Sequence, residues 1–199
     1  MKSQFEIKDK TRIQEIIDTC QYGTLALCKD DIPYSVPMNF TYHNEIFYFH
    51  GSKKGKKIDF INDNQNASFS LVEDISFIPS YFSSKDELSC PATHFFKSLS
   101  ILGKIQIINE YQEKVDALES LMQKLQPEGK YKDMNLEVYQ KMIDATCVFK
   151  LVPSEIKGKI KLGQHLPPER FNLILEHLEK RGSDNDKKTL QLMKEIRCN

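Results

Sequence analysis

Apolar positions near the start of the chain recur with a helical period. In residues 9–20, DKTRIQEIIDTC, the spacing i, i+3, i+4, i+7 places Ile13, Ile16, Ile17 and Cys20 on one face. Asp9 precedes this face and is the expected N-cap, because its carboxylate can accept a free backbone N–H of the first helical turn. We therefore predict a helix over residues 9–20.

After residue 20 the helical spacing of apolar residues ends, and short apolar segments follow that are typical of strands. Strands are predicted at 22–28 (YGTLALC), 33–42 (PYSVPMNFTY) and 45–51 (EIFYFHG), with turns at KDDIP and HN between them. Connections this short join antiparallel strands, so the pattern predicts a meander.

Helical and strand-like patterns alternate through the middle of the chain. The expected elements are a short helix at 55–64, a strand at 67–72, a loop over 73–93, a long strand at 95–109 bent at Gly103, a helix at 109–125 and a strand at 146–153. Asn109 and Gln112 have the spacing of a capping box for the helix at 109–125. Its expected apolar stripe is Tyr111, Val115, Leu118, Met122 and Leu125. About six short strands with packed helices favour an antiparallel barrel, because closure removes exposed edges.

The last 39 or so residues differ from the rest, because they contain helical patterns only. Residues 167–182 and 185–198 are two amphipathic segments separated by the turn sequence GSDND. The first of them carries Phe171, Ile174, Leu175 and Leu178 on one face. We expect a barrel domain over residues 1–160 and a C-terminal helical extension over residues 161–199.

Composition narrows the function classes. The 199 residues contain 28 Lys and Arg and 28 Asp and Glu, so there is no global positive field and nucleic acid is an improbable partner. The five cysteines include no CxxC pair, which argues against a disulfide framework or a metal site and favours the reducing cytoplasm. No segment approaches the roughly 20 apolar residues of a membrane span, so no membrane association is expected.

A cluster of lysines follows the third predicted strand. The sequence HGSKKGKK at 50–57 places four lysines and two glycines between a strand and a helix. One interpretation is a solvated loop, which is the usual role of such a charge run. The other is a phosphate site, because Gly51 and Gly55 expose backbone N–H groups, Ser52 adds a hydroxyl and the helix directs its positive end to the same place. The GxxxxGK[ST] spacing of a P-loop is absent.

Pro37 interrupts a segment that is otherwise suited to a strand. Proline cannot donate a ladder hydrogen bond, so it marks an edge strand or an irregularity. Backbone groups left unpaired there could bind a planar heterocycle, although a plain edge strand explains the residue equally well.

The ordered motifs resemble the FMN-binding split-barrel family, the pyridoxamine 5'-phosphate oxidase-related proteins. They are GTLA at 23–26, VPMNF at 36–40, IFYFHG at 46–51, GKK at 55–57, FFKSLSILGKIQII at 95–108 and EKVDALESLM at 113–122. The resemblance covers about residues 15–160 and is strongest to the branch of nitroimidazole-resistance reductases. It implies a mainly β fold, an antiparallel six-stranded split β-barrel with flanking helices, to which this chain adds the C-terminal helical pair.

The same resemblance implies a cofactor, FMN, and a homodimer with FMN at its interface. The backbone at Val36, Pro37, Met38 and Asn39 would contact the isoalloxazine edge. The ribityl phosphate would be surrounded by His50, Gly51, Ser52, Lys56 and Lys57. Lys53 and Lys54 are expected to be merely solvated. From the second subunit, Phe96, Lys97 and Ser98 would approach the flavin.

The chain departs from the family pattern at several positions. Phe96 stands where the family often has Tyr, so a hydroxyl is missing there. The end of the chain, EIRCN, lacks the arginine-containing motif of true pyridoxamine phosphate oxidases, which argues against vitamin B6 oxidation. The segment at 158–182 is similar to FMN-binding proteins described as negative transcriptional regulators, with His165 in place of the usual Asn.

Three functions remain open from the sequence. The leading hypothesis is an FMN-dependent oxidoreductase that passes electrons from NAD(P)H to a small acceptor, such as a nitro compound or a quinone. The second is a flavin-binding regulator or sensor without turnover, and the third is a haem-binding or haem-degrading split barrel. No catalytic residue is assigned. Among the histidines we favour His50, which ends a strand beside the lysine cluster, whereas His94 fits a role at the flavin or in packing equally well.

Overall fold

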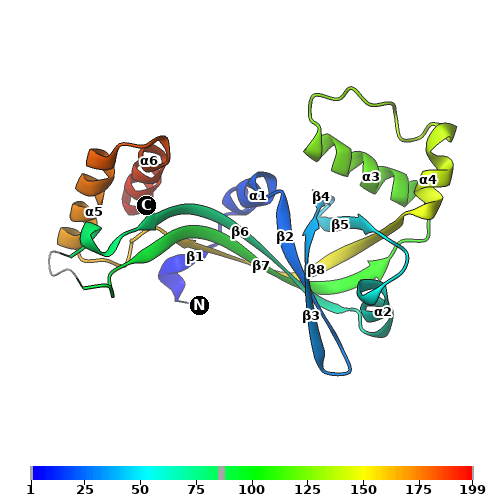
Figure 1. Cartoon of the computed structure of the whole chain (residues 1–199), viewed down its shortest axis with the longest axis horizontal. Helices are drawn as coiled ribbons and strands as arrows, with labels where there is room; N and C mark the ends of the chain where they lie inside the picture. The colour runs from blue at the N-terminus through cyan, green and yellow to red at the C-terminus, as the bar shows by residue number, and fades with distance from the viewer. Residues whose placement is uncertain (1, 85–87, 199) are drawn as a thin grey trace. The chain divides into compact units, whose positions relative to one another are not determined.

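The computed structural model describes residues 2–84 and 88–198 (Figure 1). The chain forms two compact units, which we describe separately. Unit 1 consists of residues 1–13, 72–98 and 158–199, and unit 2 consists of residues 14–71 and 99–157. The long strands β6 (Asn66–Ile78), β7 (Thr93–Ile107) and β8 (Cys147–Lys161) contribute residues to both units.

The described residues form an eight-stranded sheet with the order β3-β2-β6-β7-β8-β5-β4, and β1 pairs with β8. The remaining strands are β1 (Glu6–Ile7), β2 (Tyr22–Lys29), β3 (Ile32–Asn39), β4 (Thr41–His43) and β5 (Ile46–Gly51). The registers that define the pairings of β1, β2, β4 and β5 are antiparallel. The mainly β, antiparallel class is therefore confirmed, and β3 and β4 are the two ends of the hydrogen-bonded path.

The strand count differs from the six that we predicted. The predicted strand at 33–42 is two strands, because the buried Phe40 separates β3 from β4. The predicted loop over 73–93 was wrong at its start, where β6 continues to Ile78 and a 3-10 turn covers Ser80–Phe82. Strand β8 continues past Pro153 to Lys161, because its last residues pair with β1 at Gly158 and Lys159.

Among the described residues, four α-helices contribute residues to unit 2, and the first of them begins in the N-terminal residues of unit 1. They are α1 (Lys10–Thr19), α2 (Lys56–Asp63), α3 (Tyr111–Leu125) and α4 (Gln140–Ala145), with a 3-10 turn at Glu137–Tyr139. Asp9 accepts the backbone N–H of Thr11 at 2.8 Å, as predicted for the cap of α1. The predicted capping box of α3 was wrong. The Glu110 carboxylate caps this helix by accepting the backbone N–H of Gln112 at 3.0 Å and that of Glu113.

The buried face of α3 agrees with the predicted stripe at Val115, and Tyr111 and Leu118 of the stripe pack against buried residues, but the face also includes residues outside the stripe. Val115, Ala117 and Leu121 are buried, whereas Leu125 is an exposed residue at the end of the helix. Ala117 packs with Tyr48 of β5 and Val148 of β8. The helix thus holds the ends of two sheet strands through contacts that a stripe of large residues did not identify.

Unit 1 contains the C-terminal helical pair, α5 (Pro168–Arg181) and α6 (Asp184–Cys198), which matches the predicted segments. The predicted apolar face of α5 is confirmed by the burial of Phe171, Ile174 and Leu178. Between the helices, the fully buried Asp186 accepts the Arg181 Nε–H at 2.9 Å and the Ser183 hydroxyl at 2.7 Å. The Arg181 guanidinium and these hydrogen bonds lower the pKa of Asp186 to about 2. The turn is therefore tied by a charge-assisted network rather than by apolar packing alone.

Candidate functional site

The lysine cluster forms the turn between β5 and α2 (Figure 1). The Ser52 hydroxyl accepts the backbone N–H of Lys54 at 3.2 Å, which closes a small turn. Gly55 has a φ of 110°, a conformation that side-chain-bearing residues rarely adopt, and it is the N-cap of α2 without a side-chain hydrogen bond. The N–H groups of Ile58 and Asp59 both donate to the Gly55 carbonyl, whereas those of Lys56 and Lys57 precede the first helical hydrogen bond of α2.

Lys57 is the lysine of the cluster that turns back toward the sheet. Its half-buried side chain passes Gly51 and places Nζ 5.0 Å from the centre of the Phe149 ring. A Cβ at position 51 would lie 2.6 Å from this Nζ, so only glycine leaves room for the ammonium there. Burial lowers the pKa of Lys57.

The partners of the Lys57 ammonium are weak ones. The Met38 thioether lies 3.7 Å from Nζ, and sulfur is a poor hydrogen-bond acceptor. Among residues 2–84 and 88–198, no carboxylate lies within ion-pair distance of Nζ. The positive charge of Lys57 is therefore partly desolvated and has no negative partner among the described residues. Such a charge favours the binding of an anion.

The other lysines of the cluster have different surroundings. Lys56 is exposed and lies over the rings of Tyr34 and Phe60, with Nζ 5.0 and 5.3 Å from their centres. Lys53 and Lys54 are exposed. The cluster thus divides into one lysine directed inward, one held on aromatic rings and two at the surface.

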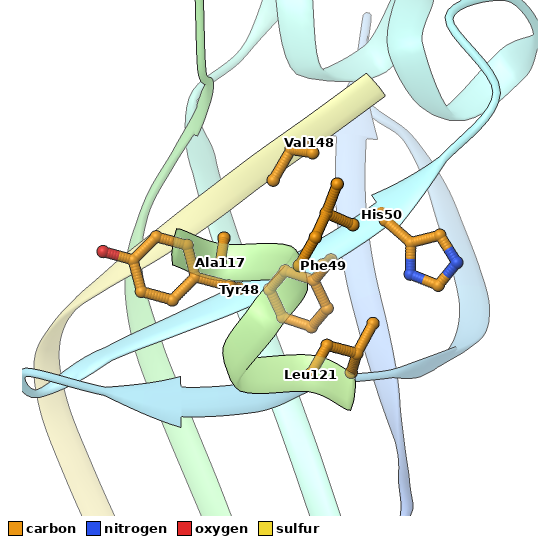
Figure 2. Close-up of a pocket in the computed structure, with 7 residues that line it drawn as sticks. Tyr48, Phe49, His50, Ala117, Leu121 and Val148 are labelled. Atoms are coloured by element: carbon orange, nitrogen blue, oxygen red, sulfur yellow. The ribbon is translucent and has the colours of Figure 1, made fainter. Parts of the chain in front are cut away.

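His50 ends β5 immediately before Gly51. Figure 2 shows its imidazole directed away from Tyr48 and Ala117. The space among these residues has no room for a water molecule. The His50 ring is at the surface, yet the surrounding protein and then the nearby Lys57 charge lower its pKa from the ordinary value of 6.5. His50 is therefore a neutral neighbour of the Lys57 ammonium at neutral pH.

Strand β3 brings the Val36–Asn39 segment to the same unit. In its pairing with β2, Val36 lies opposite Leu25 and Met38 lies opposite Gly23. Pro37 is exposed, and β3 is an end of the hydrogen-bonded path, so the inference that proline marks an edge strand is confirmed. The Asn39 amide donates to the Gln21 carbonyl at 3.2 Å.

Three of the predicted site residues belong to unit 1 and not to unit 2. Phe96 lies under the Lys159 ammonium, whose Nζ is 5.2 Å from the ring centre. Lys97 forms a 3.3 Å ion pair with the partly buried Glu73. Ser98 is half-buried. The structure therefore unites Met38, Gly51 and Lys57, while an approach of the Phe96–Ser98 segment from a second subunit stays a prediction.

Two residues of β8 complete the surroundings of Lys57, and the sequence did not indicate them. Cys147 lies opposite Gly51 in the register of β5 with β8, and Phe149 lies opposite Phe49. Burial raises the pKa of the Cys147 thiol, and the Lys57 charge opposes that rise. The pairing joins segments about a hundred residues apart, and neither residue belongs to a local motif.

Comparison with known proteins places these features in a family. A family model described as pyridoxamine 5'-phosphate oxidase matches residues 9–160. A protein of Bacteroides thetaiotaomicron described as a 5-nitroimidazole antibiotic resistance protein is 24% identical over 78% of this chain and 86% of its own, with a TM-score of 0.63. No curated protein matches.

Two further solved structures resemble the chain. The flavocytochrome Anf3 from Azotobacter vinelandii is 20% identical over 79% of this chain and 69% of its own, with a TM-score of 0.66. An FAD- and haem-binding protein from Mycobacterium smegmatis is 18% identical over 89% of this chain and 80% of its own, with a TM-score of 0.65. At these identities the likeness concerns the fold, the split barrel. Among the described residues, no helix combines the length and the apolar character needed to cross a bilayer.

We expect Lys57→Gln to raise the pKa of His50, because the substitution removes a positive charge that opposes protonation. The pKa should remain below 6.5, since burial is the larger cause and persists. Histidine resonances followed by NMR across a pH titration measure the change. Lys54→Gln, at an exposed lysine of the same turn, is the matched control. An unchanged His50 midpoint in Lys57→Gln would contradict the geometry described for these two side chains.

Proposed function

Because the chain belongs to the pyridoxamine 5'-phosphate oxidase family, we propose that it is an FMN-dependent oxidoreductase whose lysine site receives the terminal phosphate of FMN. One observation carries the proposal: the half-buried Lys57 ammonium has a thioether as its hydrogen-bond partner and needs an anion.

The chemistry of the site suits a phosphate in particular. A phosphate monoester carries a charge of about −1.5 to −2 at neutral pH and has three acceptor oxygens. Lys57 offers ammonium donors, and α2 offers the backbone N–H groups of Lys56 and Lys57 together with the positive end of the helix. His50 is a neutral imidazole that can donate one further hydrogen bond, so all of these groups favour a dianion over a neutral ligand.

The flavin ring is assigned to β3. This strand is an end of the sheet path, so one row of its backbone groups faces away from β2, and Pro37 removes one N–H from the strand. Met38 connects the two parts of the proposed site, because its sulfur lies 3.7 Å from Lys57 Nζ. Val36, Pro37, Met38 and Asn39 would present carbonyl and amide groups to the edge of the ring.

Structural neighbours support a flavin in general. The Mycobacterium smegmatis protein is described as binding FAD and haem, and the Azotobacter vinelandii protein is described as a flavocytochrome. We choose FMN because the Lys57 ammonium is a donor to which its terminal phosphate could bind. FMN held by these residues would supply hydride-transfer chemistry between NAD(P)H and a small acceptor, for which we propose a nitro compound or a quinone.

The protein's part in this chemistry is to bind and orient the cofactor. Phe96 offers no hydroxyl, so we assign no acid or base to that position. We further propose a homodimer in which Phe96, Lys97 and Ser98 of a second subunit approach the ring. Leu102 of β7 and Val152 of β8 are 45% and 38% exposed and offer apolar surface for such an interface. Sedimentation at micromolar concentration measures whether the protein is a dimer, and a monomer alone would contradict the proposed homodimer.

Replacing Lys56 and Lys57 together by Ala should weaken FMN binding about 30- to 1000-fold, the worth of roughly 2–4 kcal/mol of charge-assisted hydrogen bonds. Riboflavin lacks the phosphate and should bind the variant as it binds the original protein. Quenching of flavin fluorescence measures both affinities.

The matched control is Lys53→Ala with Lys54→Ala, which removes the same charge from the exposed part of the turn. This control should weaken FMN binding only slightly and leave riboflavin binding unchanged, because exposed charges are screened and riboflavin is neutral. Equal and large losses of FMN and riboflavin affinity in the Lys56 and Lys57 variant would show that the phosphate lies elsewhere.

The oxidoreductase part of the proposal predicts that NAD(P)H reduces the bound FMN without oxygen, and that a nitro compound or a quinone reoxidises it. Anaerobic stopped-flow absorbance records the loss and return of the oxidised flavin band. Because we assign no indispensable acid or base, His50→Ala should lower the rate by roughly tenfold to a hundredfold. Tight FMN binding with no reduction would contradict turnover and favour the regulator or sensor.

A further inference from the structure

Unit 1 contains a cavity of about 450 Å³ on the side of α5 where the helix begins. This volume is in the range of small-molecule sites. Its described lining is Ser83, Cys90, Pro91, Ala92, Thr93, Lys161, His165, Leu166, Pro167, Arg170 and Ile174. All of these residues belong to unit 1, and none of them belongs to the proposed flavin site.

The charged side chains among the described residues of the cavity have one sign. Lys161 and Arg170 are cations that line it, and none of the described lining residues is acidic. Within the described part of the chain, neither cation has a carboxylate within ion-pair distance. Burial, and then the Lys161 charge, lower the pKa of His165 at the same cavity. Two half-buried cations without a counter-charge favour an anion.

The two cations are held in place and still have donors available. Lys161 donates to the Thr93 hydroxyl, which uses one of its three N–H groups. Arg170 donates from Nε to the Ser83 carbonyl at 3.1 Å and from Nη2 to the Ser83 hydroxyl at 3.3 Å. Two of its five N–H groups are thereby used, so the remaining ones can bind a ligand from a fixed position.

Part of the cavity wall is apolar. Leu166, Pro167 and the buried Ile174 lie on the side of α5, and Pro91 and Ala92 lie before β7. A free inorganic ion would leave these surfaces in contact with water, whereas a hydrocarbon or aromatic body would cover them. The lining therefore fits a molecule that has both an anionic end and an apolar end.

We propose that this cavity binds a small organic oxyanion, with its carboxylate or phosphate head at Lys161 and Arg170 and its apolar body against Leu166 and Ile174. Its residues differ from those of the lysine site of unit 2. Its ligand is a candidate substrate or effector for the chain.

Titration of the full-length protein with phenyl phosphate, benzoate and benzyl alcohol tests the proposal. These probes share an aromatic body and differ in their head group. Calorimetry should detect at least one of the anions with a Kd below about 1 mM, and benzyl alcohol should bind at least tenfold more weakly. The ratio of the two anions then identifies the head group. Equal binding of the neutral and anionic probes, or no binding of either anion, overturns the proposal.

Variants locate the binding. Lys161→Gln should weaken the anion at least tenfold, and Lys180→Gln, which removes the same charge from the exposed part of α5, should leave it unchanged. Arg170→Lys keeps the charge but loses the planar donors, and should weaken binding while circular dichroism confirms the fold. Equal affinity in the original protein and Lys161→Gln overturns the assignment.

The lysine site of unit 2 is a competing location for phenyl phosphate, and it is tested separately. Anion binding at the cavity should survive Lys56→Ala with Lys57→Ala, and FMN binding should survive Lys161→Gln. Loss of anion binding in the Lys56 and Lys57 variant would show that the probes report the unit 2 site, and would overturn the cavity proposal while leaving the flavin proposal in place.

Discussion

A cluster of buried phenylalanine rings determines where the strands of unit 2 can lie. Phe69 of β6 is at its centre, with ring centres 5.1, 5.6 and 5.0 Å from those of Phe40, Phe47 and Phe49. Phe149 of β8 stacks on Phe49 at 5.3 Å. Aromatic pairs favour such edge and offset contacts in addition to the free energy of burial. The cluster therefore fixes β5 against β6 and β8, and with β5 it fixes the turn that carries the lysines.

Two lysines lie at the surface of this aromatic cluster, and their surroundings differ in an instructive way. Lys124 of α3 has its Nζ 3.5 Å from the centre of the Phe40 ring and donates to the Ile17 carbonyl at 2.9 Å. Burial lowers the pKa of Lys124 to about 8. Because its ammonium donates to a backbone carbonyl of α1, Lys124 links α3 to α1, and we interpret it as a structural residue. Lys57 lies over Phe149, and its hydrogen-bond acceptor among the described residues is a thioether. This weak acceptor does not compensate for the free-energy cost of partly desolvating the ammonium. This contrast is the reason for proposing a binding role for Lys57 and a structural role for Lys124.

Much of the local structure could be predicted from the sequence, because it depends on neighbours along the chain. The α1, α2 and α5 helices, the β2 and β5 strands and the first part of β6 follow the periodicity of their own residues, and the glycines and lysines of the β5–α2 turn identified a phosphate-binding possibility. Interactions across the sheet were not predictable in this way. The placement of Cys147 opposite Gly51 and the pairing of Lys97 with Glu73 depend on registers between distant strands. The cap of α3 shows the same limit at short range, since Glu110 and Asn109 are adjacent and both can cap.

The small space at Gly51 also bears on how this sequence can change over time. A side chain at position 51 would occupy the place of the Lys57 ammonium, so we expect substitutions at these two positions to be coupled in evolution. A lineage that acquires alanine or serine at 51 must redirect or replace the lysine, and one that loses the lysine no longer needs the glycine. Correlated substitution at residues 51 and 57 would then divide homologous chains into those that retain an inward ammonium and those that have given up this binding chemistry.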